Sequence, residues 1–414
     1  MSELDLTLQE GAALHDAGRL EQALALYDAA LVRWPEQALL WNNRGNTLLE
    51  MAQFEDAAQS YRQALQLMPG LYDAQVALAT CLQALGQIDE ALATTGMVLE
   101  QYPDHAESHW NRALLLLLRG NYPEGWQEYE WRWKKRGFTS PLHRFSQPQW
   151  LGEAASDRTI LIHAEQGFGD TIQFCRYLPL LCERGFNVLF ACHPPLVRLM
   201  KTLDRRITVI PLGQPLPLFD CHLPLLSLPL LFATTLETIP AALPYLGPPA
   251  DRLPFWKSVL PAGNRLRAGI CWAGKTYPDP GRTVPASLLG TLADVTGIEF
   301  VSLQMGEQYE KLLLPLTDLT MLIRDFGDTA ALIAQLDLVI TIDTSVAHLA
   351  GALGKETWIL LPFAPDWRWG LLREDCPWYP GMRLYRQEQR GTWGEVLERV
   401  VRALEERLQT PGGY

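Results

Sequence analysis

The stretch PEQALLWNNRGNTLLEMAQFEDAAQSYRQALQLMP, residues 35–69, runs from one proline to the next and defines a unit that recurs along the N-terminal third of the chain. Prolines recur at intervals of 34 residues, at Pro35, Pro69 and Pro103. Small and apolar residues keep the same interval, in the sets Gly11, Gly45 and Ala79; Leu14, Leu48 and Leu82; and Ala23, Ala57 and Ala91. A single helix pair cannot bury its apolar face alone, so small residues repeated in phase predict helix pairs stacked into a solenoid.

This interval and these residue types resemble the tetratricopeptide repeat. We expect residues 1–136 to form an array of about three and a half to four repeats, the last of which begins near His109. Such solenoids present a concave surface to extended peptides, but a short array also serves to support a neighbouring domain, and both roles stay open. Residues 137–157 contain Pro141 and Pro148 and show little periodicity, so we interpret them as a linker.

Acidic side chains are concentrated in the repeat region. The chain has 47 acidic and 35 basic residues, a formal net charge of −12. Residues 1–136 contain 19 acidic and 10 basic residues (−9), which leaves 28 and 25 (−3) for the remainder. An acidic surface repels nucleic-acid phosphates, so we expect no nucleic-acid partner. The charge suits a basic polypeptide segment on the array, but a face that is only solvated is the simpler interpretation.

The sequence indicates a cytoplasmic protein. Met1 to Asp5 carries acidic residues where a secretory signal needs positive charge, and no apolar segment follows. The most apolar later stretch, residues 212–232, is interrupted by prolines, so we expect no membrane span. The seven cysteines are scattered and form no C-x-x-C pair, which argues against a disulfide framework and against a zinc site.

The pattern changes from helix pairs to alternating strands and helices near residue 158. An apolar run at Thr159–His163 predicts a buried parallel strand, and Asn187–Cys192 predicts the next one. Between them, Gly167 and Gly169 form a turn into a helix, but Ile172 stands where a dinucleotide-binding fingerprint needs its third glycine. Asp170 opens that helix, and its position suits either a helix cap or a general base at the mouth of a cleft.

A second set of strands and helices follows a proline-rich segment. We expect strands at Arg267–Trp272, Glu299–Leu303, Met321–Arg324, Leu338–Ile342 and Thr357–Leu361. Pro285 is expected to start a helix, and residues 393–408 to form a closing amphipathic helix. The fold class is therefore α plus α/β, in which residues 158–262 and 263–414 form two Rossmann-like lobes with a cleft between them.

The stretch LDLVITIDTSVAHLAGALG, residues 336–354, predicts a strand that ends at Asp343-Thr344-Ser345 and a helix that starts at once. Free N–H groups at the helix start, with the two hydroxyls, make this turn suitable for an anion such as a diphosphate. A purely structural role is also possible, in which these side chains cap the helix and His348 is a buried, hydrogen-bonded histidine.

These two segments resemble a known family. Gly167-Phe168-Gly169-Asp170 with its helix, and Asp343-Thr344 with His348 and the residues that follow, are similar to motifs of the heptosyltransferase-type bacterial glycosyltransferases. The order of array and transferase also resembles the O-linked N-acetylglucosamine transferases, by architecture alone. The resemblance implies the GT-B fold, with the acceptor on the first lobe, the donor on the second, and inversion at the anomeric carbon.

The resemblance also implies residue roles. Asp170 matches the base that deprotonates the acceptor hydroxyl, and a cation on the donor diphosphate is expected from Lys275 or Arg282, with the choice left open. The remaining donor-site residues are Gly167, Gly169, Gln304, Asp343, Thr344, Ser345 and His348. Ser345 stands where the family usually has glycine, so the identity of the donor does not carry over.

No Asp-x-Asp string occurs in the chain, so we expect chemistry without a metal and without a cofactor. The leading hypothesis is an inverting glycosyltransferase that moves a sugar from a nucleotide-diphosphate donor to a polypeptide recruited by the array. One alternative keeps the chemistry but uses a lipid-linked or surface saccharide as acceptor. Another makes the second half a catalytically degenerate scaffold for protein interaction. The aromatic segment at residues 362–369 lines a cleft or packs the lobe.

Overall fold

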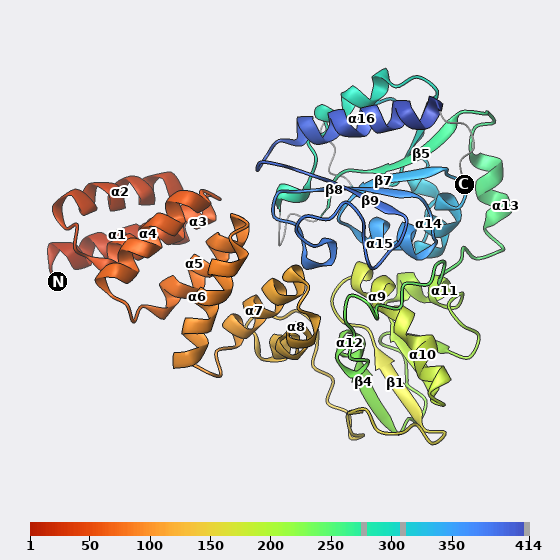
Figure 1. The fold of residues 1–414 in the computed structure, drawn as a ribbon, viewed down its shortest axis with the longest axis horizontal. Helices are drawn as coiled ribbons and strands as arrows, with labels where there is room; N and C mark the ends of the chain where they lie inside the picture. Colours follow the sequence, from red (N-terminus) through yellow and green to blue (C-terminus); the bar gives the residue numbers. More distant parts are fainter. Residues whose placement is uncertain (275–279, 307–311, 410–414) are drawn as a thin grey trace. The chain divides into compact units, whose positions relative to one another are not determined.

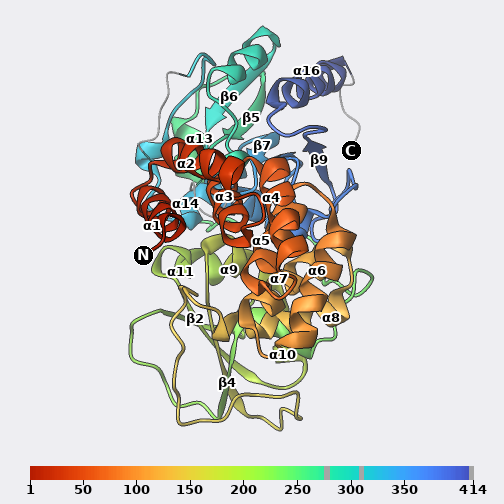
Figure 2. The ribbon, with the colours of Figure 1, turned by 90° about the vertical axis from the view of Figure 1, so that its left-hand side faces the viewer.

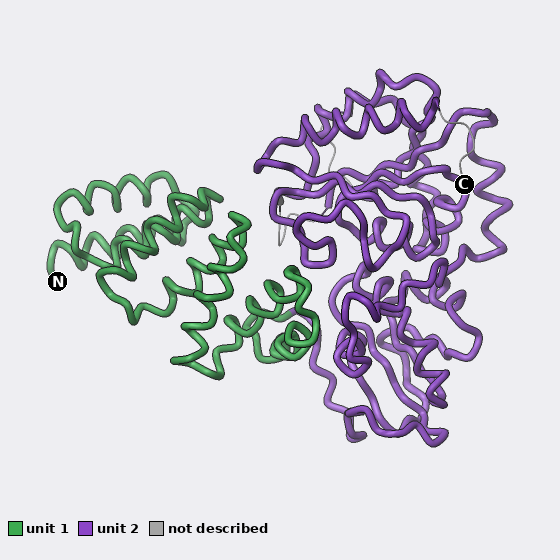
Figure 3. Tube along the Cα trace, viewed as in Figure 1, with its two compact units in different colours: residues 1–138 green, residues 139–414 purple. Residues whose placement is uncertain are grey.

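The structure, a computed structural model, describes residues 1–274, 280–306 and 312–409. Lys275, one of the two cations considered for the diphosphate, lies outside these ranges. The chain divides into two compact units, residues 1–138 and 139–414, which Figure 3 shows in different colours. Each unit has its own core and is described separately below.

The first unit is an array of antiparallel helix pairs, as the repeat predicts (Figures 1 and 2). Its helices are α1 (Glu3–Asp16), α2 (Leu20–Arg33), α3 (Ala38–Glu50), α4 (Phe54–Leu67), α5 (Tyr72–Ala84), α6 (Ile88–Gln101), α7 (Ala106–Arg119) and α8 (Tyr122–Tyr129), followed by a 3-10 turn at Glu130–Lys134. Pro35, Pro69 and Pro103 each stand two residues after the second helix of a pair. Proline cannot continue a helix there, so it sets the repeat boundary.

The small residues of the repeat lie where two helices cross closely. A Cβ atom at Gly11 would lie 2.4 Å from the Tyr27 ring, and one at Gly45 would lie 2.7 Å from the Tyr61 ring. In the third repeat Thr95 occupies the position equivalent to these tyrosines, and Ala79 replaces the glycine. A smaller partner leaves room for a methyl group, so the pairing of small and large side chains explains the predicted pattern.

The second unit begins with a four-stranded parallel sheet in the order β3-β2-β1-β4. Its strands are β1 (Thr159–His163), β2 (Asn187–Cys192), β3 (Thr208–Pro211) and β4 (Cys221–Pro224). The helices associated with it are α9 (Phe168–Phe174), α10 (Leu178–Glu183), α11 (Val197–Met200) and α12 (Leu228–Leu231). Helix α13 (Leu253–Val259) follows them in the chain and packs against α14 (Phe326–Ile333) of the next sheet. The predictions for β1 and β2 are confirmed at both ends, whereas β3 and β4 were not predicted.

A five-stranded parallel sheet follows, in the order β6-β5-β7-β8-β9. Its strands are β5 (Leu266–Cys271), β6 (Ile298–Ser302), β7 (Leu338–Ile342), β8 (Thr357–Leu361) and β9 (Met382–Arg386). Helices α14 (Phe326–Ile333) and α15 (Ser345–Ala352) connect its strands, and α16 (Trp393–Gln409) packs its apolar stripe against the sheet core (Figure 1).

Two predictions in this region are wrong in detail. The expected strand at Met321–Arg324 is instead a 3-10 turn at Thr320–Leu322. Met321 is 98% exposed, so these apolar residues do not form a buried strand. The helix expected after Pro285 is a 3-10 helix at Leu288–Asp294. Across the described ranges, no helix has the length and apolarity that crossing a membrane requires.

Candidate functional site

The two predicted motifs occupy equivalent places in the two parallel sheets. Gly167 to Asp170 follows the carboxyl end of β1 and opens α9, and Asp343 to Ser345 follows the carboxyl end of β7 and opens α15. In open α/β sheets the carboxyl ends of the strands are where ligands bind, because the turns there present free N–H groups. Both motifs are thus at the edge of the sheet where a site is expected.

Helices α9 and α15 cross directly at Gly169. A Cβ atom on Gly169 would lie 2.7 Å from His348 Cδ2 and 3.6 Å from the Ser345 Cα, so only glycine allows this approach. The crossing joins one sheet to the other. It therefore brings together two motifs that are far apart in the sequence.

Asp170 is the most constrained carboxylate of this site. One oxygen accepts a hydrogen bond of 2.9 Å from the Gly167 N–H, which caps the start of α9, and the other is ion-paired with Arg368 Nη2. Burial raises the pKa of Asp170 above the ordinary carboxyl value, whereas Arg368 and the Gly167 N–H oppose that rise. Both roles considered for this residue are compatible with the geometry: it caps the helix, and it faces the region between the sheets.

Arg368 itself uses all three guanidinium nitrogens. Besides Asp170, it donates to Asp366 Oδ1 over 2.9 Å and to Gln173 Oε1 over 2.5 Å. Its guanidinium carbon lies 4.4 Å from the centroid of the Trp367 ring, within the range of a cation–π contact. The aromatic segment that follows β8 therefore carries a cation aimed at α9.

His348 is held as a neutral imidazole. Its Nδ1 lies 2.9 Å from the Tyr379 hydroxyl, and its ring stacks on Trp369 with centroids 5.5 Å apart. Burial, together with the nearby Arg368 and Arg176 guanidinium groups, lowers the pKa of His348 well below its ordinary value. A neutral histidine offers a hydrogen bond to a ligand without adding charge.

Asp343 and Arg282 lie together at the turn before α15. Burial, and then the neighbouring Asp366, raises the pKa of Asp343 to about 6, against the opposing effect of Arg368. Arg282 Nη1 donates to the Asp343 main-chain carbonyl over 3.3 Å, and Thr344 Oγ1 accepts from the Val346 N–H as the helix cap. Arg282 thus lies at the predicted anion turn.

Gln304 stands apart from these contacts. Its side-chain oxygen accepts hydrogen bonds from the Trp272 and Ala273 N–H groups, at 3.1 and 2.9 Å, and its amide nitrogen donates to the Met305 carbonyl. It fixes the turn that leaves β5. Its further hydrogen bonds, from Cys271 Sγ to its side-chain oxygen and from its own N–H to Ser302 Oγ, lie within the same sheet, so its link to a donor site is through the shape of that turn.

Three buried side chains of this region, Arg368, Gln173 and Arg176, were not predicted from the sequence. Arg176 is buried and donates to the Trp378 carbonyl over 2.6 Å and to the Tyr245 hydroxyl over 2.9 Å. It thereby ties the chain after α9 to the chain before β9. The only sequence signal for Arg368 was its place between two tryptophans in a segment expected to line a cleft.

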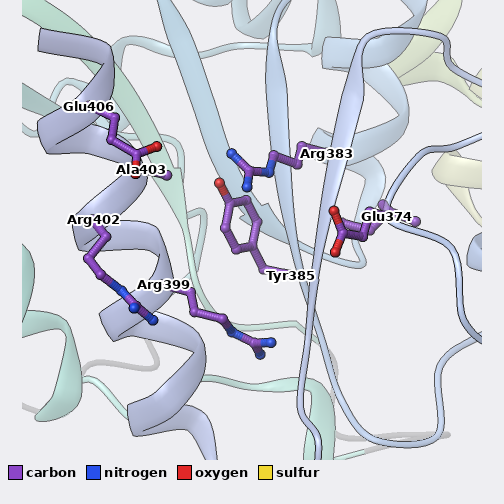
Figure 4. A pocket seen from close by; sticks show the side chains of 8 residues that line it. Glu374, Arg383, Tyr385, Arg399, Arg402, Ala403 and Glu406 are labelled. Atoms are coloured by element: carbon purple, nitrogen blue, oxygen red, sulfur yellow. The ribbon is translucent and has the colours of Figure 1, made fainter. Parts of the chain in front are cut away.

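A separate surface pocket lies between β9 and α16 (Figure 4). Its lining residues are Glu374, Arg383, Leu384, Tyr385, Arg399, Arg402, Ala403 and Glu406. None of them belongs to the predicted site, so this pocket is not where the two motifs meet. Within the described part of the chain, no group of three or more His, Cys, Asp or Glu residues is arranged to hold a metal ion.

Comparisons with known proteins identify the N-terminal repeats. Tetratricopeptide repeat families match residues 8–71 and 48–118, so this part of the chain is a tetratricopeptide repeat array. The curated protein FlbA of Caulobacter vibrioides is 28% identical over 425 residues, an alignment that covers 95% of this chain and 71% of FlbA. This relative is similar over both units.

Similar solved structures cover the array. The tetratricopeptide protein YrrB, described as having an unusual peptide-binding site, is 23% identical over 30% of this chain and 64% of its own, with a TM-score of 0.29. MamA is 16% identical over 31% of this chain and 75% of its own, with a TM-score of 0.30. The second tetratricopeptide domain of human RPAP3, solved with an HSP70 peptide, is 23% identical over 26% of this chain and 91% of its own, with a TM-score of 0.26.

Proposed function

We propose that the chain binds a polypeptide through its repeat array and transfers a sugar to that polypeptide through its α/β unit. In this proposal the two sheets are the Rossmann-like lobes of a GT-B glycosyltransferase. The donor is a nucleotide-diphosphate sugar, and the reaction is inverting and needs no metal.

The polypeptide-binding half is supported by the tetratricopeptide repeats, which form protein-interaction surfaces. The acidic balance of residues 1–136 favours a basic segment as the bound polypeptide.

The catalytic half is supported by one observation, the crossing of α9 and α15. It places the Asp170 carboxylate near the turn that opens α15, where the positive end of the helix and the hydroxyls of Thr344 and Ser345 suit a diphosphate. A base and a leaving-group site have to be close for a displacement at the sugar carbon, and Arg282 at the same turn offers charge to the departing diphosphate.

The second candidate is a protein-interaction scaffold without catalysis, and the comparisons favour it over transfer. The matching families are repeat families and cover the array alone.

Calorimetric titration with UDP, GDP, ADP, CDP and dTDP, in the presence of a chelator, separates the two candidates. A transferase is expected to bind one diphosphate selectively, and Arg282→Ala and Ser345→Tyr are each expected to weaken that binding by about tenfold or more. Arg373→Ala is the matched control, because Arg373 is exposed and paired with Asp375. If none of the five diphosphates binds, the scaffold is the better conclusion.

With the base of the nucleotide known, transfer is measured with a radiolabelled sugar donor and a lysate from the native host. Asp170→Asn is expected to abolish labelling of polypeptide while it leaves diphosphate binding intact. Labelling of glycolipid in place of polypeptide would show that the acceptor is a saccharide.

A further inference from the structure

A buried ion pair joins the two sheets of the α/β unit at the proposed base. Arg368 lies after β8, and its side chain is 10% exposed, while Asp170 lies on α9 of the other sheet. We propose that Arg368 is a positioning residue that keeps Asp170 ionised, so that the base is charged only while the segment after β8 is docked on α9. This inference rests on the proposed function, in which Asp170 removes the acceptor proton.

The first step concerns the charge of Asp170. A general base has to be ionised before it accepts a proton, but burial favours the neutral carboxylic acid. Three groups oppose that effect, the Arg368 guanidinium and the main-chain N–H groups of Gly167 and of Asp170 itself. The two N–H groups are part of the same helix turn and are always present, so Arg368 is the contact that a movement between the sheets would remove.

The second step concerns the orientation of the Asp170 carboxylate. Arg368 holds two residues of α9 at once, Asp170 through Nη2 and Gln173 through Nε, and these lie three positions apart on one face of the helix. On its own segment it is held by Asp366 Oδ1 and by the Trp367 ring. A guanidinium fixed at four points cannot turn away, so the orientation of the carboxylate is fixed with it.

The other charged and titratable groups around Asp170 do not replace Arg368. Asp366, on the same segment as Arg368, raises the pKa of Asp170. His193, after β2, has a pKa lowered by burial, and His348 on α15 has a pKa well below its ordinary value, so both imidazoles are neutral near pH 7. Among the residues that the structure describes, Arg368 is thus the cation that balances this carboxylate.

The direct test is a pH titration of Asp170 by carbon-13 carboxyl NMR of the full chain labelled at aspartate. The Asp170 resonance is assigned by its absence in Asp170→Asn. Arg368→Ala is expected to raise the Asp170 midpoint by about 1–3 pH units, the usual effect of one arginine on an adjacent carboxylate. In Arg368→Lys the midpoint is expected to return part of the way to its original value. Arg373 is an exposed arginine nearby in the sequence, and Arg373→Ala is expected to leave the midpoint unchanged. An unchanged midpoint in Arg368→Ala would overturn the proposal.

The kinetic test uses release of the nucleoside diphosphate from the donor that the binding experiment identifies. The acid limb of the pH profile of kcat/KM is expected to move upward in Arg368→Ala by the same interval as the NMR midpoint, and to move back in Arg368→Lys. A shift of the Asp170 NMR midpoint without a shift of the pH profile of kcat/KM would refute the positioning role. Absence of release from the unaltered protein would instead refute the proposed transferase, while the NMR midpoint would still decide whether Arg368 sets the charge of Asp170.

Discussion

Replacing Gly169 with alanine tests whether the crossing of α9 and α15 holds the two sheets together. The added Cβ would lie 2.7 Å from His348 Cδ2, whereas two carbon atoms are at their best separation at about 3.5–4.0 Å. One of the two helices would therefore have to retreat by about 1 Å, or the imidazole would have to turn.

The imidazole has little freedom to turn. His348 Nδ1 is hydrogen-bonded to the Tyr379 hydroxyl at 2.9 Å, its ring is stacked on Trp369, and the residue is 4% exposed. Forcing a methyl group into such a site costs about 1–3 kcal/mol. Alanine in place of glycine returns about 0.5–1 kcal/mol of helix propensity. We expect Gly169→Ala to lower the free energy of unfolding of this unit by about 1–2 kcal/mol.

Urea unfolding of the full chain, followed by tryptophan fluorescence, measures this change. Hydrogen exchange locates it, because peptides from α9 and α15 are expected to lose protection together. Gly394→Ala is the matched control, since no atom lies within 4 Å of an added Cβ there, and its stability should be unchanged or slightly raised. In a His348→Ala background the cost of Gly169→Ala should largely disappear. A Gly169→Ala protein as stable as the parent would refute this account of the crossing.

Three further changes have measurable consequences. Gly45→Ala should destabilise the array by about 1–3 kcal/mol, because the Cβ would lie 2.7 Å from a buried tyrosine ring, whereas Gly96→Ala in open space should stabilise it; thermal melting followed by circular dichroism compares the two. Asp343 has a pKa of about 6 in the folded protein against an ordinary 3.8, so this carboxyl group imposes no folding penalty below pH 4, and the penalty for burying its ionised form grows as the pH rises through 6. Asp343→Asn should therefore raise the unfolding free energy at pH 8 by up to about 3 kcal/mol and have little effect near pH 4, and equal effects at both would contradict this. Arg176→Met leaves a main-chain carbonyl without its donor and should cost about 1–3 kcal/mol in urea unfolding; no loss would show that the carbonyl finds another partner.

The strands that the sequence predicts at their observed bounds share one property. Thr159–His163, Asn187–Cys192, Leu338–Ile342 and Thr357–Leu361 are interior strands of parallel sheets and are covered on both faces, so they are almost continuously apolar. An apolar run of this kind can be recognised in the sequence without knowledge of the strands that pair with it. The repeat array is predicted for a similar reason, because its contacts are local and recur.

The missed and mistaken elements lack that property. Thr208–Pro211 and Cys221–Pro224 have four residues each and end in proline, and Met382–Arg386 is an edge strand that contains two arginines. Edge strands need fewer apolar residues, so their sequences resemble those of loops. Met321–Arg324 shows the converse, since apolar residues stand in an exposed turn there, and a short run of four cannot be told from a strand.

The site is predicted in part for the same physical reason. The turns at Gly167–Asp170 and Asp343–Ser345 are recognisable because a strand, a polar turn and a helix follow one another in the chain. Arg368 lies 198 residues from Asp170, and only the packing of one sheet against the other brings them together. A long-range pair of this kind leaves no local pattern in a single sequence.

The buried pair of Asp170 and Arg368 also separates the two candidate functions on physical grounds. Replacing both members of a buried ion pair with apolar residues is often neutral or stabilising, whereas removing one member is costly. In a scaffold, combining Asp170→Leu with Arg368→Met leaves the repeat array unchanged, so partner binding should survive. The exchange costs the contacts of Arg368 with Asp366 and Gln173 and the hydrogen bond from the Gly167 N–H. A transferase cannot accept the exchange, because the carboxylate that takes the proton is gone. Urea unfolding of the double variant measures the cost of the lost contacts. Where the unit stays folded, loss of sugar transfer beside intact partner binding reports on chemistry and not on stability.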